Sequence, residues 1–249
     1  MKRIVYYIFA PFRFLYKVYF ILVFLILAIP MFPLFYFLLK TDKRIHQAFK
    51  LKRIWAKLLL LFTGILVVQK NKELLPKSPF VVCANHASYL DIVLMFIVIP
   101  NTFLFLGKAE LLKWPIIKIF FRNMDIPVDR SNGMKAKRSI ELTKEAVQKG
   151  FSIAIFPEGL IPSEGIPKMK PFKRGAFVLA VSQQVDLVPV TFANNWKLFA
   201  TESDLFGPGS PGIAKVIFHS PISTKGKTEK DIPELVKETF SKIEKGISY

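Results

Sequence analysis

The N-terminal part of the chain sets one long apolar run between charged residues. Residues 18–39 contain no charge and are bounded by Lys17 and Lys40. As a straight helix these 22 residues would span ~33 Å, about one hydrocarbon thickness. Pro30 and Pro33 lie inside the run, and each removes a backbone donor and favours a kink or a break. The pattern therefore predicts either one kinked membrane span or a segment that dips into the membrane and returns.

The next segment, residues 45–62, has the pattern of an amphipathic helix. Its apolar and basic side chains fall on different faces: Ile45, Phe49, Trp55, Leu58, Leu59 and Phe62 on one, and Lys50, Arg53 and Lys57 on another. Beside so apolar a neighbour, this pattern favours a helix in the plane of the membrane interface over a core helix of a soluble domain. Positive charges flank residues 18–39 on both sides and define no topology, so we expect a monotopic anchor rather than a true span.

From about Gly64 the pattern changes to short β-rich runs that alternate with helical stretches. Strands are predicted at 65–69, 80–84, 102–106, 125–128, 152–156, 187–192 and 215–218. Helices are predicted at 89–98, 115–121, 135–149 (with Gly150 as a stop), 174–181 and 233–245. Such alternation indicates an α/β fold with a mostly parallel or mixed central sheet covered by helices. We therefore divide the chain into a membrane-anchoring helical segment, residues 1–62, and an α/β domain, residues 63–249.

Composition and charge point to the same kind of surface. Hydrophobic residues make up 52% of the chain, and 36 basic against 18 acidic residues give a net charge of +18. A positive field attracts polyanions. No nucleic-acid-binding motif accompanies it, so anionic membrane lipids are the expected partner and nucleic acid is not. The single cysteine, Cys83, allows no internal disulfide. The first apolar run is not followed by a small-residue cleavage site, so we do not interpret it as a removed signal peptide.

Of the three histidines, His86 is the candidate for chemistry. His46 lies on the basic amphipathic segment and His219 ends a predicted strand, which favours interfacial and structural roles. His86 follows the strand at 80–84, and the carboxyl ends of strands in an α/β sheet are where ligands bind. Five residues on one helix differ by ~140° around its axis, so His86 and Asp91 can meet only if His86 lies in the loop and Asp91 in the next helix's first turn.

A second interpretation of the same residues stays open. Ser88 and Asp91 have the spacing of a capping box, in which Asp91 merely holds the start of the helix. Other kinds of site have less support. No serine lies in a G-x-S-x-G elbow, Cys83 lies within an apolar strand, and no His, Cys or Asp cluster has metal-ligand spacing. Residues 207–212 match G-x-G-x-x-G, but two prolines and a strand-like run after them indicate a turn.

Four segments in order resemble the glycerolipid acyltransferases, most closely the 1-acylglycerol-3-phosphate acyltransferases. Residues 85–91 (N-H-A-S-Y-L-D) are similar to the N-H-x-x-x-x-D motif of that family. Residues 125–130 (D-I-P-V-D-R) are similar to its second block, residues 156–159 (F-P-E-G) match the start of the third, and residues 188–190 (V-P-V) match the fourth. Residues 173–176 also resemble the segment between the last two. The resemblance covers about residues 70–218.

The resemblance implies an enzyme of phospholipid synthesis that moves a fatty acyl chain from an acyl carrier protein or CoA thioester to the hydroxyl of lysophosphatidic acid. His86 would be the general base and Asp91 its orienting carboxylate. Arg130 would bind the phosphate, and Glu158 and Gly159 would position the glycerol. No cofactor or metal is implied, and the active site is expected on the cytoplasmic side of the cell membrane. The oligomeric state is not implied.

One departure from the family pattern concerns the acceptor. The family usually continues its third block with Thr-Arg, whereas this chain has Leu160 and Ile161. The resemblance implies that the missing arginine would ordinarily help to bind the phosphate of the acceptor. The phosphate would then be held by Arg130 together with nearby cations such as Lys168, Lys170, Lys173 or Arg174, or the acceptor is a different lyso-lipid. A membrane scaffold without enzyme activity would fit the anchor and the charge equally well, but it would not need the pairing of His86 with Asp91.

Overall fold

A mixed β-sheet forms the centre of the computed structural model, which describes residues 9–77, 79–108, 125–128, 133–162, 164–200 and 206–248. Within these residues seven strands lie in the order β1-β7-β6-β2-β5-β3-β4. They are β1 Ile65–Lys70, β2 Val81–Ala84, β3 Phe103–Lys108, β4 Ile126–Val128, β5 Ser152–Ile155, β6 Leu187–Phe192 and β7 Gly212–Phe218. The five strands from β6 to β4 are parallel, whereas β7 pairs antiparallel with β6 and parallel with β1. The predicted mostly parallel or mixed sheet is confirmed.

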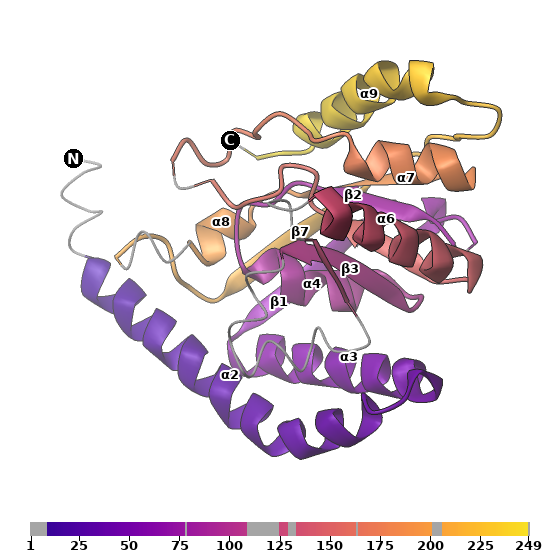
Figure 1. Ribbon diagram of the computed structural model, residues 1–249. Coiled ribbons are helices and arrows are strands. Elements are labelled where there is room, and N and C mark those ends of the chain that lie inside the picture. Colours follow the sequence, from indigo (N-terminus) through magenta and orange to yellow (C-terminus); the bar gives the residue numbers. More distant parts are fainter. Residues whose placement is uncertain are drawn as a thin grey trace.

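Helices cover both faces of the sheet (Figure 1). Helices α2 Ala10–Leu38, α3 Ile45–Phe62 and α4 Leu90–Val98 lie below it in that view, and α6 Gly133–Gln148, α7 Gly175–Gln183 and α9 Ile232–Lys245 lie above it; the short α8 Asn195–Leu198 follows β6. In β2, Val82 and Ala84 pack toward α3 and α4, whereas Val81 and Cys83 pack toward α7 and α9. Burial on both faces explains why the strand is continuously apolar.

The strands and helices predicted after residue 44 in the described part of the chain are confirmed, with boundaries that shift by up to three residues, whereas the helix of the apolar run at 18–39 begins earlier, at Ala10. The helix stop predicted at Gly150 is also confirmed, because this residue follows α6 with a φ of 87° and provides the left-handed turn that glycine accepts readily. The turn predicted at residues 207–212 leads directly into β7, so the G-x-G-x-x-G match opens a strand and not a helix. The helix predicted at 115–121 lies outside the described residues.

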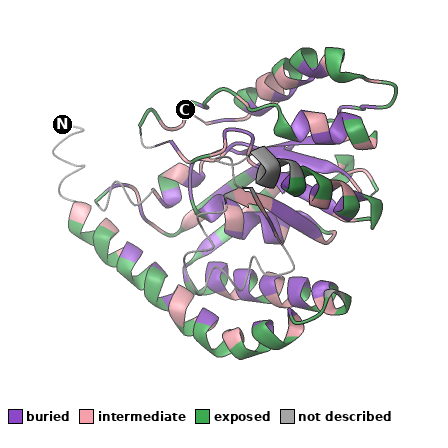
Figure 2. Ribbon diagram, in the orientation of Figure 1, coloured by how far each residue is buried: buried purple, intermediate pink, exposed green. Residues whose placement is uncertain are grey.

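Helix α2 is a single continuous element through both prolines. Pro30 and Pro33 lie inside its 29 residues, and the ribbon bends in its second half so that it turns alongside α3 (Figure 1). The helix is long and apolar enough to cross a membrane, yet only 17% of its most apolar window is buried. Its outward side is exposed, as Figure 2 shows at the lower left of the molecule, and many of the exposed side chains are large and apolar.

Helix α3 differs from the sequence expectation. Four residues of its predicted interfacial face are buried in the main core, namely Ile45, Phe49, Trp55 and Leu59, whereas Leu58 is half-buried and Phe62 is exposed. The face expected in the membrane interface is thus mostly a core face. The periodicity correctly indicates an amphipathic helix, but an apolar stripe in the sequence does not show whether protein or lipid covers it.

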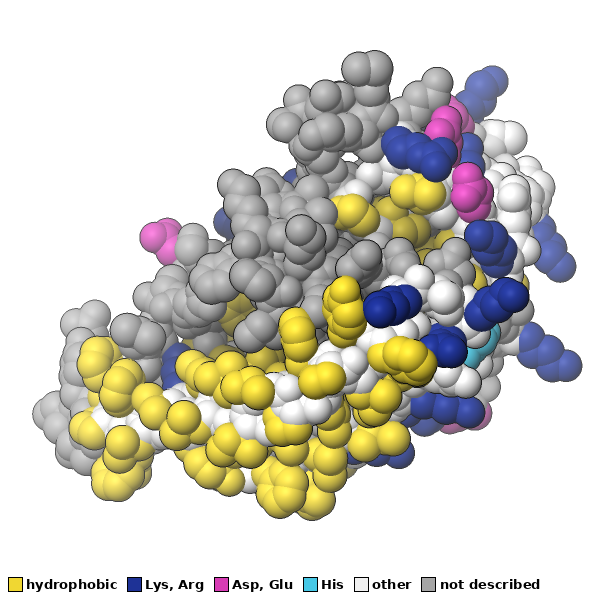
Figure 3. All heavy atoms as spheres, turned by 60° about the horizontal axis from the view of Figure 1, so that its bottom comes forward, with side chains coloured by type: hydrophobic (Ala, Val, Ile, Leu, Met, Phe, Trp, Pro, Cys, Tyr) yellow, Lys and Arg dark blue, Asp and Glu magenta, His cyan; other side chains and the backbone are white. Residues whose placement is uncertain are grey.

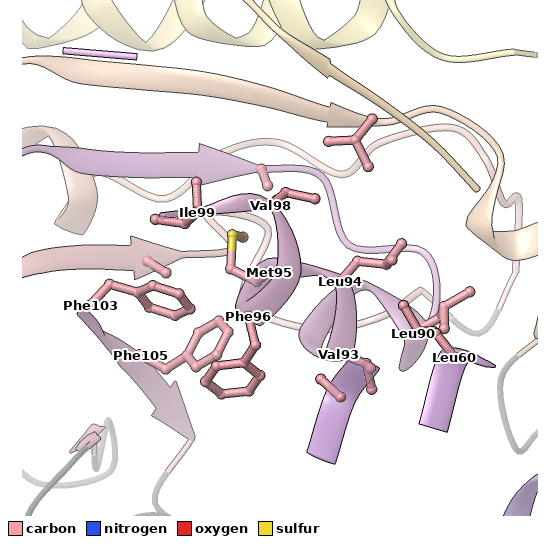
Figure 4. Packing of buried hydrophobic residues seen from close by; sticks show 14 of the residues in the cluster. Leu60, Leu90, Val93, Leu94, Met95, Phe96, Val98, Ile99, Phe103 and Phe105 are labelled. Atoms are coloured by element: carbon pink, nitrogen blue, oxygen red, sulfur yellow. The ribbon is translucent and has the colours of Figure 1, made fainter. Parts of the chain in front are cut away.

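Helix α4 packs against α3 and contributes buried apolar side chains along most of its length to this core. Figure 4 shows Phe96 of α4 beside Phe103 and Phe105 of β3, and Leu90 of α4 beside Leu60 of α3. Two polar contacts fasten α3 to the same layer. Lys52 forms a buried ion pair of 3.1 Å with Asp125, and the Arg53 guanidinium donates to the carbonyls of Phe96, Ile99 and Pro100 at the end of α4. Arg53 thus holds the C-terminal end of α4, and Lys52 joins α3 to the residue that precedes β4.

Candidate functional site

Three neighbouring parallel strands deliver polar side chains to one edge of the sheet. The order β6-β2-β5 places the carboxyl ends of these strands side by side. His86 follows β2, Glu158 follows β5 and Asn195 follows β6. Because parallel strands end at a common edge, residues that are far apart in the sequence meet there. This edge is the candidate active site.

His86 and Asp91 are brought together as the sequence spacing predicts. His86 lies in the loop after β2 and Asp91 in the first turn of α4, and the ring nitrogen Nδ1 lies 3.0 Å from Asp91 Oδ2. The Asp91 side chain is fully buried, and the His86 side chain is 11% exposed. A buried carboxylate on Nδ1 directs the other nitrogen, Nε2, outward and stabilises the ring when it takes a proton. The pair has the geometry of a general base with its orienting acid.

Half of the predicted capping box is present, because Asp91 accepts from the Ser88 N–H while Ser88 Oγ accepts from the Leu90 N–H and not from that of Asp91. The backbone N–H groups of Ala87 and Ser88 both donate to Asp91 Oδ2, at 2.8 and 2.9 Å. The Ser88 hydroxyl donates to the Phe199 carbonyl at 2.6 Å and accepts from the Leu90 N–H. One carboxylate oxygen therefore holds the loop and pairs with His86, so the two interpretations are not alternatives. The same bonds that begin α4 fix the position of the base.

The second oxygen of Asp91 has a partner that sequence reasoning missed. Asn195 Nδ2 donates to Asp91 Oδ1 at 2.7 Å, across 104 residues of sequence. No local pattern marks Asn195, which is one of two consecutive asparagines at the start of a four-residue helix. Only the pairing of β6 with β2 places this amide next to the loop after β2.

Glu158 is placed at the site, but its carboxylate is directed into the protein. It is 3% exposed, and its two oxygens accept from the backbone N–H groups of His86 and Lys170, each at 2.8 Å. Burial raises the pKa of Glu158, and the two N–H donors oppose that rise. Gly159 has a φ of 76° in the turn that follows, a conformation that other residues adopt only with strain. The two hydrogen bonds of the Glu158 carboxylate therefore fix the backbone at His86 and at Lys170.

An aromatic ring stacks on one face of the His86 imidazole. The Phe156 ring, at the end of β5, stacks on His86 with a centroid separation of 4.0 Å and an interplanar angle of 10°. Stacking and the Asp91 contact together restrict both side-chain torsions of His86. Phe156 belongs to the F-P-E-G segment, so its position next to His86 could be found from motif order, although the stacking itself could not.

The remaining candidates take structural positions. His46 contacts the Thr102 hydroxyl at 2.9 Å, on the layer away from the active-site loop. His219 Nε2 lies 2.8 Å from the Thr191 hydroxyl, which donates to the Ile243 carbonyl, so the ring must be the donor. Burial raises the pKa of the Cys83 thiol to about 12, which keeps it protonated and unsuited to act as a nucleophile.

Arg130 lies outside the described residues. The segment that carries the alternative cations is described, and its backbone is attached beside the active site. Lys170 donates its N–H to Glu158, and Lys173 donates its N–H to the Pro157 carbonyl at 2.9 Å. Both side chains are exposed. Cations of this segment therefore emerge from a backbone that is tied to the end of β5.

Fold and site together define an α/β protein with a histidine–carboxylate pair at the carboxyl edge of its sheet. Comparison with known proteins makes this specific. The Acyltransferase family model matches residues 66–193, and the chain belongs to this family. The match contains His86, Asp91, Arg130 and Glu158, and it includes the strands β2, β5 and β6 that position the site.

Individual relatives agree in name. The chain is 32% identical over 169 residues to 1-acyl-sn-glycerol-3-phosphate acyltransferase alpha of Mus musculus, covering 64% of this chain and 55% of that protein. It is 30% identical over 171 residues to the beta form of Homo sapiens, covering 68% and 60%. The chain thus spans little more than half the length of these curated relatives. The crystal structure of the acyltransferase PlsC of Thermotoga maritima, which acts on 1-acyl-sn-glycerophosphate (LPA), superposes with a TM-score of 0.74 at 27% identity, covering 97% of this chain and 95% of that one.

Proposed function

We propose that the protein transfers a fatty acyl chain from an acyl thioester to the free hydroxyl of lysophosphatidic acid, which gives phosphatidic acid for phospholipid synthesis. The observation that carries the proposal is the contact between His86 and Asp91 at the carboxyl edge of the sheet. The names of the relatives support the choice of acceptor. The donor is the thioester of acyl carrier protein or of CoA.

The reaction follows from the orientation of the ring. Asp91 occupies Nδ1, and His86 Nε2 takes the proton of the acceptor hydroxyl as its oxygen attacks the thioester carbonyl carbon. The carbon–sulfur bond then breaks, and the thiolate leaves with the proton returned by the imidazolium. The Asp91 charge stabilises that imidazolium, which is present while the tetrahedral intermediate exists. No acyl group is attached to the protein in this sequence of steps.

A membrane surface would supply the acceptor. Apolar side chains cover α2 and the outer side of α3, and Lys and Arg side chains gather at one end of this face (Figure 3). Its most exposed members include Phe12, Leu15, Leu22, Ile26, Ile29 and Leu61. An exposed apolar area of this extent is typical of a membrane-binding or protein-binding surface. Together with the positive charge, it supports attachment to a bilayer whose anionic lipids face the cytoplasm.

The way α2 is attached favours a monotopic arrangement over a span. Tyr16 and Tyr19 donate to the carbonyls of Thr63 and Phe62, both at 2.8 Å. Phe24 packs edge-on against Trp55 of α3, with ring centroids 5.0 Å apart. A helix bonded to the body at several points along its length lies against it, whereas a membrane-crossing helix would leave it. We therefore place α2 flat in the interface.

The proposed activity is tested with purified protein in lipid micelles. Labelled acyl-CoA and acyl carrier protein thioesters are supplied in parallel, with lysophosphatidic acid, a phosphodiester lyso-lipid and an uncharged monoacylglycerol as acceptors. We expect phosphatidic acid from wild type and none above background from His86→Ala. Transfer only to acceptors other than lysophosphatidic acid would replace the proposed substrate by a different lyso-lipid. Ile161, which is half-buried where the family usually carries an arginine, is the feature that favours this second candidate.

A further inference from the structure

Asn195 is a fully buried polar residue whose hydrogen bonding is incomplete. Its Nδ2 donates to Asp91 Oδ1 at 2.7 Å, while its other amide atom, Oδ1, is buried and accepts no hydrogen bond from the described residues. An unpaired buried acceptor costs about 1–3 kcal/mol. An apolar residue of similar shape would avoid this cost but would leave the buried Asp91 Oδ1 without a donor, so the bond to Asp91 is what the asparagine provides here.

The backbone around Asn195 is fixed more firmly than a four-residue helix would require. The Asn85 side chain donates to the Phe192 carbonyl at 3.0 Å and accepts from the Phe192 N–H at 2.8 Å. The Asn194 side chain in turn bonds to β7, donating to the Ile213 carbonyl and accepting from the Lys215 N–H, each at 2.8 Å. These pairs hold both sides of residue 195. The amide is therefore presented to Asp91 from a rigid base.

We propose that Asn195 is a positioning residue that holds Asp91 in the orientation in which its carboxylate pairs with His86. This inference rests on the proposed general-base mechanism. With three donors on Oδ2 and one on Oδ1, the carboxylate can neither rotate nor turn away from the ring. The fourth bond is the only one of these that comes from outside the active-site loop and its helix, so it ties the pair to the sheet.

Loss of the Asn195 donor should change the proton affinity of the pair in a known direction. A donor to the charged form of a carboxylate lowers proton affinity, so its removal raises the affinity of the Asp91–His86 pair as a whole. The ring is then protonated at higher pH, and the free base is available over a narrower range. Glu158 is the other titratable group that faces the pair. It keeps both of its N–H partners in the variants below.

The test compares Asn195→Leu and Asn195→Asp with wild type and with Thr224→Val. Leucine removes the donor and keeps the branching of the side chain, and aspartate places a second buried carboxyl group beside Asp91, with which it would share a proton. Thr224→Val removes a buried hydrogen bond to the Val185 carbonyl at the opposite edge of the sheet, and serves as the stability control. The quantities measured are kcat, the KM for acceptor, the melting temperature and the pH dependence of kcat.

We expect the leucine variant to lose on the order of tenfold in kcat with little change in KM, and the acid limb of its pH profile to move upward by about one unit. The aspartate variant, in which the shared proton can again donate to Asp91 Oδ1, should move it less than the leucine variant, and the control should not move it. Wild-type kcat and an unmoved acid limb in Asn195→Leu would overturn the proposal. So would a lower melting temperature without any shift, which is the result of a purely structural role.

A second readout does not depend on turnover. The chain has only three histidines, so the ring signals of His46, His86 and His219 can be assigned by NMR from single substitutions. The titration midpoint of the His86 signal should rise in the leucine variant and stay fixed in the control. If wild type transfers no acyl group, the proposed function fails while this titration still decides whether Asn195 acts on the pair. An unchanged midpoint in the leucine variant contradicts the inference.

Discussion

Replacing Asp91 by asparagine would separate its charge from its hydrogen bonds. The carboxylate accepts four bonds, three on Oδ2 and one on Oδ1. In the variant, the amide oxygen must take the Oδ2 position, because the N–H groups of Ala87 and Ser88 need an acceptor there. The amide NH2 then faces Asn195, whose side chain can turn over and accept through its otherwise unpaired Oδ1. The hydrogen-bond pattern survives and the negative charge does not.

The cost to stability should therefore be small. Hydrogen bonds to a charged acceptor contribute roughly twice as much as neutral ones, while removal of a buried charge offsets part of the loss. We expect Asp91→Asn to lower the free energy of unfolding by about 1–2 kcal/mol. The melting temperature should fall by roughly 2–4 °C for each kcal/mol in a domain of this size.

The cost to activity should be much larger. Asp91 and a protonated His86 form an ion pair whose charges lie about 4 Å apart, worth on the order of 4 kcal/mol at an effective dielectric constant of ~20. That attraction exists in the transition state and not in the neutral ground state, so its loss lowers kcat by about 10³-fold. Because the asparagine oxygen still accepts from Nδ1, the ring keeps its tautomer. The loss should thus stay below the ~10⁴-fold seen when a triad asparagine imposes the wrong tautomer.

The assay measures specific activity per folded protein and thermal unfolding on the same preparation. A 10³-fold loss in kcat with a melting temperature near that of wild type supports the catalytic role of the charge. Near-normal specific activity in a destabilised protein would refute it, and Asp91 would then be a capping residue only. Asp91→Ala provides a comparison, because it removes both the charge and the acceptors and should lose stability as well.

Three further predictions concern the base, the membrane face and the acceptor. His86→Ala should abolish transfer without releasing the protein from vesicles, and turnover near the wild-type rate would contradict the mechanism. Replacing both Leu22 and Ile26, which are 51% and 67% exposed, by aspartate should weaken vesicle sedimentation strongly, whereas Ile140→Asp on the other side of the sheet should not. Arg130→Ala should raise the KM for lysophosphatidic acid by a factor equivalent to ~1.5–3 kcal/mol, and equal losses on an uncharged acceptor would remove Arg130 from the phosphate site.

Much of the fold and the centre of the site could be predicted because they are encoded locally. A strand buried on both faces must be continuously apolar, and β2 is. The spacing of His86 and Asp91, between the end of a strand and the start of a helix, restricts them to one arrangement, and that arrangement is present. Motif order placed Glu158 at the same edge, since the ends of parallel strands meet there.

The rest depended on contacts that no local pattern records. Asn195 reaches Asp91 only through the pairing of β6 with β2, and Glu158 has its oxygens turned to backbone N–H groups and not to an open cavity. Helix α3 illustrates the same limit on a larger scale. Its sequence determined that one face is apolar, but the tertiary structure decided that most of this face packs on α4 and the sheet while α2 keeps its apolar side exposed. The physical reason is that burial is a property of the partner surface, and the chain's own periodicity contains no information about that partner.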